Sequence, residues 1–144
     1  MIKIEFPKKQ VKTRNLNDGR EVFDAIRKKW LLLTPEEWVR QNMLQYLLLV
    51  KKYPSSLIAV EKEIRLGELK KRCDLVVYHR NSLPWMIIEC KEMNVPLSEK
   101  TLEQILRYHI TLPADFLIIT NGSYSFGFQK KDNQFFEINE FPEF

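Results

Sequence analysis

The chain has 144 residues, of which 44% are hydrophobic and 29% are charged, with a formal net charge of +4 at pH 7. These proportions are typical of one soluble globular domain and exclude a disordered chain. No apolar run approaches the roughly 20 residues of a membrane-spanning helix, and the first residues lack the apolar region of a signal peptide. The four glycines leave no room for a G-x-x-x-x-G-K phosphate-binding loop, which excludes an ATP-driven motor of that type.

The N-terminal part of the chain is predicted to consist of an arm followed by a helix. Residues 1–17 carry a stretch of basic side chains, and we expect a solvated, extended arm rather than a DNA-binding one. A single domain is predicted over residues 18–144. Its first helix is predicted to start at Asn17 or Asp18 and to reach about Trp30, since apolar side chains recur at helical spacing.

A second helix is predicted between Thr34 and about Lys52. Thr34 has the properties of an N-cap, and Pro35 stands at the first helical position, where its missing N–H costs nothing. Glu37 stands where a glutamate completes a capping box. Most of the side chains that follow are apolar, so we expect a largely buried helix.

Alternating polar and apolar residues predict that most of the remaining chain forms strands. The first three strands are joined by short connections, which favour an antiparallel meander. A helix capped by Ser98 follows, and Asn121-Gly122 is a hairpin signal between two later strands. The predicted strands cover residues 57–66, 72–79, 85–91, 116–120, 124–128 and 134–138, and the predicted helix covers residues 99–110. The predicted class is therefore α/β.

Charged residues interrupt two of these strands where a buried strand should be apolar. Asp74 lies in the second strand, and Glu89 and Lys91 lie in the third, two residues apart and therefore on one face. Burying two carboxylates is costly unless something binds them, and a divalent metal ion would do so. The alternative that the residues leave open is a structural ion pair at one end of the sheet.

Two cysteines, Cys73 and Cys90, each neighbour one of these acids along the chain. Because side chains alternate along a strand, each cysteine faces away from its acid. Their spacing is not that of metal ligands. We expect two buried thiols without a disulfide, in a reducing cytoplasm.

The strands, the acids and the next helix together resemble the PD-(D/E)XK nuclease superfamily. They resemble more closely the N-terminal nuclease domain of type I restriction enzyme motor subunits. The resemblance covers about residues 20–125 and includes a Q-x-x-x-Y pattern in the helix after the strands. The residues that carry it are Asp74, Glu89, Lys91, Gln104 and Tyr108.

The resemblance implies a restriction-endonuclease-like core in the order helix, three-strand meander, helix, strand, with a C-terminal hairpin as an extension. It implies that Asp74 and Glu89 bind Mg²⁺ or Mn²⁺ and that Lys91 lies near the attacking water. Gln104 and Tyr108 then have a role in handling DNA.

Two further expectations concern the surroundings of this site. Lys70, Lys71 and Arg72 lead directly into Asp74, so we expect them to contact the phosphates of DNA. Glu37 matches an acid that many superfamily members carry on the first core helix and would join the catalytic residues, although a capping role accounts for it as well.

The predicted function is Mg²⁺-dependent cleavage of DNA by a cytoplasmic nuclease with no membrane partner. One alternative is a non-catalytic nucleic-acid-binding module with the same fold. Another is a nuclease subunit that docks on a separately encoded restriction or helicase motor, because the type I domain normally precedes such a motor and these 144 residues contain none. The sequence leaves the preferred DNA and the oligomeric state open.

Overall fold

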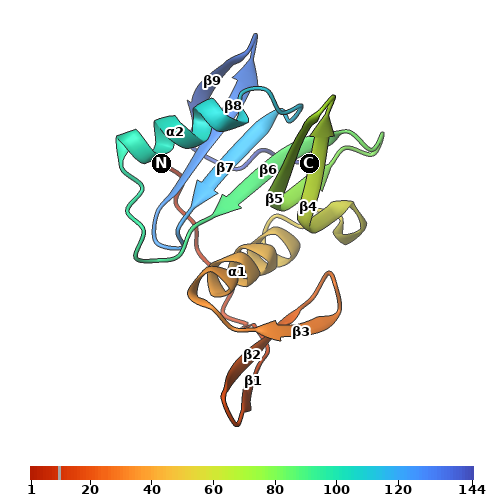
Figure 1. Ribbon diagram of the computed structural model, residues 1–144, viewed down its shortest axis with the longest axis vertical. Helices are drawn as coiled ribbons and strands as arrows, with labels where there is room; N and C mark the ends of the chain where they lie inside the picture. The colour runs from red at the N-terminus through yellow and green to blue at the C-terminus, as the bar shows by residue number, and fades with distance from the viewer. Residues whose placement is uncertain (10) are drawn as a thin grey trace.

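The computed structural model describes residues 1–9 and 11–144 (Figure 1). Their strands form a small three-stranded sheet near the N-terminus and a large six-stranded sheet. In chain order the elements are β1 (Thr13–Leu16), β2 (Gly19–Asp24), β3 (Lys29–Leu32), α1 (Pro35–Leu49), a 3-10 turn (Ser55–Leu57), β4 (Ile58–Leu66), β5 (Leu69–Tyr78), β6 (Pro84–Cys90), α2 (Glu99–His109), β7 (Phe116–Thr120), β8 (Ser125–Lys131) and β9 (Gln134–Ile138).

The large sheet has the strand order β4-β5-β6-β7-β8-β9. The first three strands form the predicted antiparallel meander. The chain then crosses over through α2, so that β7 pairs with β6 in parallel, and β8 and β9 follow in antiparallel register. The protein is a mixed α/β structure, and the predicted order of helix, three-strand meander, helix and strand is present from α1 to β7.

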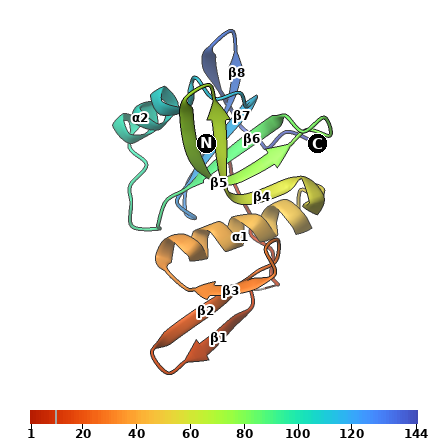
Figure 2. The same ribbon diagram turned by 45° about the vertical axis from the view of Figure 1, so that its right-hand side comes forward.

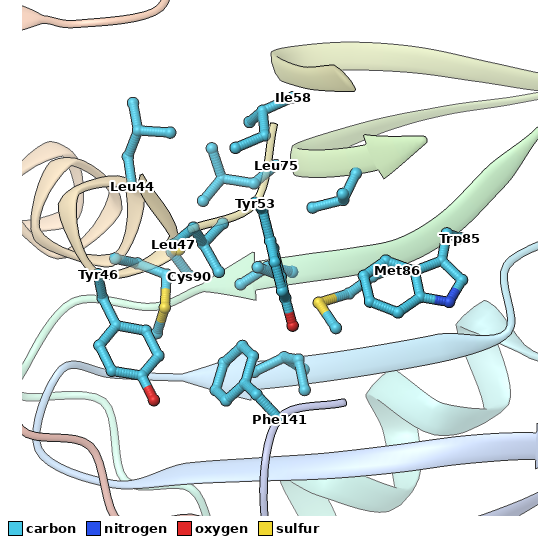
Figure 3. Packing of buried hydrophobic residues seen from close by; sticks show 14 of the residues in the cluster. Leu44, Tyr46, Leu47, Tyr53, Ile58, Leu75, Trp85, Met86, Cys90 and Phe141 are labelled. Carbon is cyan, nitrogen blue, oxygen red and sulfur yellow. The ribbon is translucent and has the colours of Figure 1, made fainter. Parts of the chain in front are cut away.

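The two helices pack on opposite faces of the large sheet. The cluster beneath α1 includes Leu44, Leu47, Leu75 and Met86, which are all fully buried (Figure 3). The cluster on the other face joins strand residues such as Ile87 to the apolar side of α2. Because successive side chains alternate along β5 and β6, these central strands contribute to both clusters; β6 is almost entirely buried, and β5 is buried mainly in its second half.

The helix predicted from residue 18 to Trp30 is wrong, because this segment forms β2 and β3. Gly19 begins β2 with φ of +152°, directly after the turn at Asn17 and Asp18. An Asp-Gly pair between alternating residues is a hairpin signal, and it outweighs the helical spacing of the apolar residues. Val22 and Asp24 are fully buried two residues apart, which is the period of a strand.

The segment predicted as an arm contributes to the structure on both sides of residue 10. Ile2 is buried, and its N–H donates a hydrogen bond to the carbonyl of Ser125 at 2.7 Å. Thr13–Leu16 pairs with β2, so the chain on either side of residue 17 belongs to one hairpin. The division into an arm and a domain at that residue remains a prediction.

The start of α1 agrees with the predicted N-cap but not with the capping box. The hydroxyl of Thr34 accepts a hydrogen bond from the N–H of Glu37 at 3.1 Å. The carboxylate of Glu37 does not return to Thr34 and instead lies beside Arg27 and Arg40. The helix ends at Leu49, three residues before the predicted end.

Figures 1 and 2 show α1 lying between the large sheet and the small one, so that one helix contacts both.

Cys73 and Cys90 are free thiols and buried, as predicted. Among residues 1–9 and 11–144, no helix is long and apolar enough to cross a membrane.

Candidate active site

Two carboxylates lie side by side in the middle of the large sheet. The antiparallel register pairs Leu75 with Ile88, so Asp74 on β5 and Glu89 on β6 occupy the next opposing positions. The N–H of Cys90 donates a hydrogen bond to Asp74 Oδ2 at 2.8 Å, which fixes that carboxylate against β6. Both side chains are largely buried, with 15% and 16% of their surface exposed.

Burial shifts the ionisation of both acids. Burial, followed by the neighbouring charge of Asp74, raises the pKa of Glu89 to about 8. The pKa of Asp74 is also raised, mainly by burial. A pair of buried carboxyls with raised pKa values marks a candidate functional site, because ionising both of them is favoured by a further positive charge between them.

Lys91 follows β6 directly and lies close to this pair. Its N–H donates a hydrogen bond to the carbonyl of Thr120 at 2.8 Å, which holds the chain beside the end of β7. The Lys91 ammonium lowers the pKa of both Asp74 and Glu89, opposing the effect of burial. The structure therefore brings together the three residues that the sequence predicted to form the centre of the site.

The donor set fits a hard divalent cation such as Mg²⁺. Glu89 Oε1 is buried and accepts no hydrogen bond from the described residues. His109 Nε2 lies 3.6 Å from it, but burial lowers the pKa of His109 to about 3, so the imidazole is neutral. Asp74 and Glu89 would hold the ion. No group of three or more His, Cys, Asp or Glu side chains in residues 1–9 and 11–144 has metal-ligand geometry, so the other ligands would be waters or phosphate oxygens.

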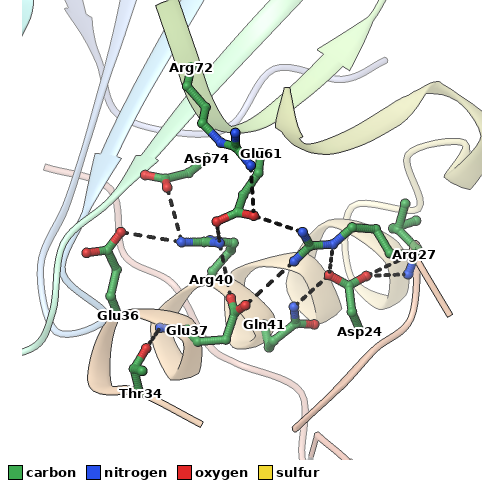
Figure 4. A network of polar contacts seen from close by, with 11 residues as sticks. Asp24, Arg27, Thr34, Glu36, Glu37, Arg40, Gln41, Glu61, Arg72 and Asp74 are labelled. Carbon is green, nitrogen blue, oxygen red and sulfur yellow. Dashed lines mark hydrogen bonds and ion pairs between the residues drawn. The ribbon is translucent and has the colours of Figure 1, made fainter. Parts of the chain in front are cut away.

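A network of partly buried ion pairs borders the site on the side of α1 (Figure 4). Arg40 is only 6% exposed, and its guanidinium lies 3.4 Å from Asp74 Oδ1 and 2.6 Å from Glu61 Oε1. Glu37 lies 3.3 Å from Arg40, so the structure joins Glu37 to Asp74 through this arginine. Burial raises the pKa of Glu37, whereas hydrogen bonds from Arg27 and Arg40 overcome burial and lower the pKa of Glu61 to about 2.

Gln104 and Tyr108 lie one turn apart on α2, and both are exposed. Tyr108 is linked to the site through Lys71, whose ammonium donates a hydrogen bond to its carbonyl at 2.8 Å and lies over its ring. Exposed side chains at i and i+4 can meet one ligand together. Their predicted role with DNA remains a prediction.

The basic run before Asp74 is split between the two faces of β5. Lys70 and Arg72 are exposed, whereas Lys71 is only 4% exposed and points toward α2. Burial lowers the pKa of Lys71 to about 8. The expected patch of three phosphate contacts is therefore reduced to Lys70 and Arg72, because side chains alternate along a strand.

Arg40 and His109 lie at the site and were not among the predicted residues, whereas Lys71 was predicted as a phosphate contact and instead points toward α2. Arg40 stands three residues after Glu37, so helical spacing places the two on one face. A charged residue among the apolar side chains of a buried helix is a signal that could have identified it. His109 and Lys71 are recognisable only once α2 is docked on the sheet.

The chain matches the family described as type I restriction enzyme R protein N terminus (HSDR_N) over residues 35–142. A comparison with curated proteins found no match. The matched segment begins with the first residue of α1 and includes the whole large sheet. It also contains Asp74, Glu89 and Lys91, as the sequence resemblance led us to expect. The chain therefore belongs to the family of type I restriction enzyme R protein N termini.

Proposed function

We propose that this chain is a metal-dependent endonuclease domain that hydrolyses phosphodiester bonds of DNA, with a restriction-endonuclease-like fold. The observation that carries the proposal is the buried pair Asp74 and Glu89, which has raised pKa values and one oxygen without a hydrogen-bond donor. Membership of a family named after the R protein of type I restriction enzymes supports a nuclease-like role.

Each residue has a defined task in the proposed reaction. Asp74 and Glu89 would hold Mg²⁺ or Mn²⁺, and the ion would supply polarisation of the phosphoryl oxygen and a bound water of lowered pKa. Lys91 supplies positive charge beside the attacked phosphate as charge develops there. The water oxygen forms a new bond to phosphorus, the bond to one sugar oxygen breaks, and that oxygen takes up a proton. Gln104, Tyr108, Lys70 and Arg72 hold the DNA.

The test is cleavage of supercoiled plasmid and of a linear duplex in Mg²⁺, in Mn²⁺ and in a chelator. We expect metal-dependent cleavage by the parent protein and none by Asp74→Asn or Glu89→Gln. Asp115→Asn is the matched control, because Asp115 is an exposed acid that pairs with His79 away from the site. Cleavage that survives in both carboxylate variants would show that another site, or a contaminant, cuts the DNA.

The family also favours a second candidate, in which the domain works within a larger restriction complex. In that case the chain has weak activity alone and gains activity with a separately encoded motor subunit. The measurement is co-purification with a helicase-type partner, followed by the same cleavage assay. A parent protein that binds DNA and never cuts it, with or without a partner, supports the alternative of a non-catalytic binding module.

A further inference from the structure

We propose that the N-terminal sheet is a positioning element of the candidate metal site, acting on Asp74 through a partly buried chain of ion pairs. The inference rests on the proposed function, because it assigns a task to residues that orient a metal ligand. It also extends the site beyond the family likeness. The match begins at residue 35, whereas the small sheet ends at Leu32.

The chain of contacts begins at Asp24, a fully buried carboxylate at the end of β2. Its Oδ1 accepts hydrogen bonds from the backbone N–H groups of Ile26 and Arg27, at 2.9 and 2.7 Å. Its Oδ2 accepts from Arg27 Nε at 2.9 Å and from Gln41 Nε2 at 3.0 Å. All four bonds go to a charged acceptor; three of them hold the turn between β2 and β3, and the bond from Gln41 attaches that turn to α1.

The middle of the chain is Glu61 on β4, which lies between two arginines (Figure 4). Arg27 Nη1 donates to Glu61 Oε2 at 2.9 Å, and Arg40 Nη1 donates to Glu61 Oε1 at 2.6 Å. Glu61 has φ of +51°, which is rare for a residue with a side chain and costs free energy. The two arginines bind the carboxylate that this conformation presents.

The chain ends at Asp74, whose two oxygens are held from different directions. Cys90 N–H donates to Oδ2, and the guanidinium of Arg40 lies 3.4 Å from Oδ1. Arg40 contacts Glu61 more closely, at 2.6 Å, so it is anchored on β4 rather than on Asp74. Arg40 thus orients Asp74 and leaves its carboxylate able to bind a metal ion. Arg40 is therefore a positioning residue and not a catalytic one. Partners behind a metal ligand commonly act in this way.

The main experiment breaks the chain at a point remote from Asp74. Arg27→Met removes the link between the small sheet and Glu61 and leaves Arg40 and Asp74 in place. Arg14→Met is the matched control, because Arg14 belongs to the same sheet but pairs with Glu21 outside the network. We expect Arg27→Met to weaken Mn²⁺ binding, measured by calorimetry, about tenfold and to lower kcat with little change in KM. Arg14→Met should match the parent in both.

A second set of variants addresses Arg40 itself. Arg40→Met leaves buried carboxylates without their cation and is expected to lose Mn²⁺ binding and some stability. Arg40→Lys keeps the charge but not the forked geometry, so it should recover part of the Mn²⁺ affinity that Arg40→Met loses. If Arg27→Met or Arg40→Met fails to fold, the lysine variants at the same positions provide the comparison.

A metal-free measurement separates this inference from the proposed function. Arg27→Met and Asp74→Asn are combined in one protein. The urea concentrations at the midpoint of unfolding are then compared for the single and double variants. Non-additive shifts, absent when Arg14→Met replaces Arg27→Met, would link the small sheet to Asp74 even if the parent neither binds Mn²⁺ nor cuts DNA. Additive midpoints together with parental Mn²⁺ affinity in Arg27→Met would overturn the positioning role.

Discussion

Replacing Lys91 should separate the proposed DNA cleavage from DNA binding most clearly. Its ammonium acts on Asp74 and Glu89, so we place it beside the attacked phosphate. Lys91→Ala should lower the rate of cleavage by about 100-fold or more, because it removes charge stabilisation at the transition state. Affinity for a short duplex should change little, since it depends on many phosphate contacts. Equal losses in rate and in affinity would instead make Lys91 a DNA-binding residue.

The raised pKa of Glu89 predicts that the stability of the fold depends on pH. Its pKa is about 8 in the folded protein, above the ordinary value of 4.5, so between these pH values the folded state holds a proton that the unfolded state has lost. Rising pH therefore favours unfolding over this window. Glu89→Gln carries no such proton, and we expect its Tm to rise relative to that of the parent from about pH 5 to about pH 8. Parallel Tm curves for the two proteins would contradict the raised pKa.

At the scale of single elements, the cap of α1 sets the position of the residues that border the site. Thr34→Ala removes the acceptor for the N–H of Glu37 and should lower the free energy of unfolding by about 1 kcal/mol. Ser98→Ala is the matched control, because it removes the cap of α2, which accepts from the N–H of Thr101 at 3.2 Å. Urea unfolding measures both. Since Arg40 lies on α1, only Thr34→Ala should also weaken Mn²⁺ binding.

The central strands explain why two carboxylates can be held so closely. β5 and β6 are covered by a helix on each face, which leaves little water to solvate the acids. The N–H of Cys90 and the guanidinium of Arg40 take the place of water around Asp74. The strands therefore create the site by enclosing the acids.

At the scale of the whole molecule, a divalent ion should stabilise the fold. A ligand that binds only the folded state adds about 1.4 kcal/mol at a concentration ten times its Kd. We expect millimolar Mn²⁺ to raise the Tm of the parent protein and to leave the Tm of Asp74→Asn unchanged. Thermal melting with and without chelator measures this. An identical rise in both proteins would locate the metal elsewhere.

The exposed basic residues of β5 predict how DNA binding depends on salt. Replacing Lys70 and Arg72 with glutamine removes two expected phosphate contacts, so the slope of log affinity against log salt should fall by about 0.9 for each. Lys131→Gln is the control, since Lys131 is exposed at the end of β8, three strands away from β5 in the sheet. Binding in a salt series measures the slope. If the double variant keeps the parental slope, DNA lies on another face.

Local signals in the sequence were sufficient for the elements from α1 onward. Thr34 and Ser98 were predicted as caps and are caps, and the residues predicted for β7 and β9 are the observed ones. Charged residues in buried strands also identified Asp74 and Glu89 without any knowledge of the fold. These features depend on neighbours within a few residues, which is the range over which turn chemistry and side-chain periodicity act.

Tertiary structure decided most of the rest, because the deciding contacts join distant parts of the chain. The helix predicted up to Trp30 is an exception, since a local hairpin signal at Asp18-Gly19 opposed it and pairing between β2 and β3 buries Val22 and Asp24 at strand spacing. Glu37 had the sequence of a capping box, yet its carboxylate turns to two arginines whose charge outweighs one hydrogen bond at the helix end. Lys71 turns inward because α2, packed on the sheet, supplies the carbonyl of Tyr108 as its hydrogen-bond acceptor. The sequence by itself determined which residues are chemically unusual, and only the packing of α1, α2 and the small sheet around β5 and β6 determined which of them meet.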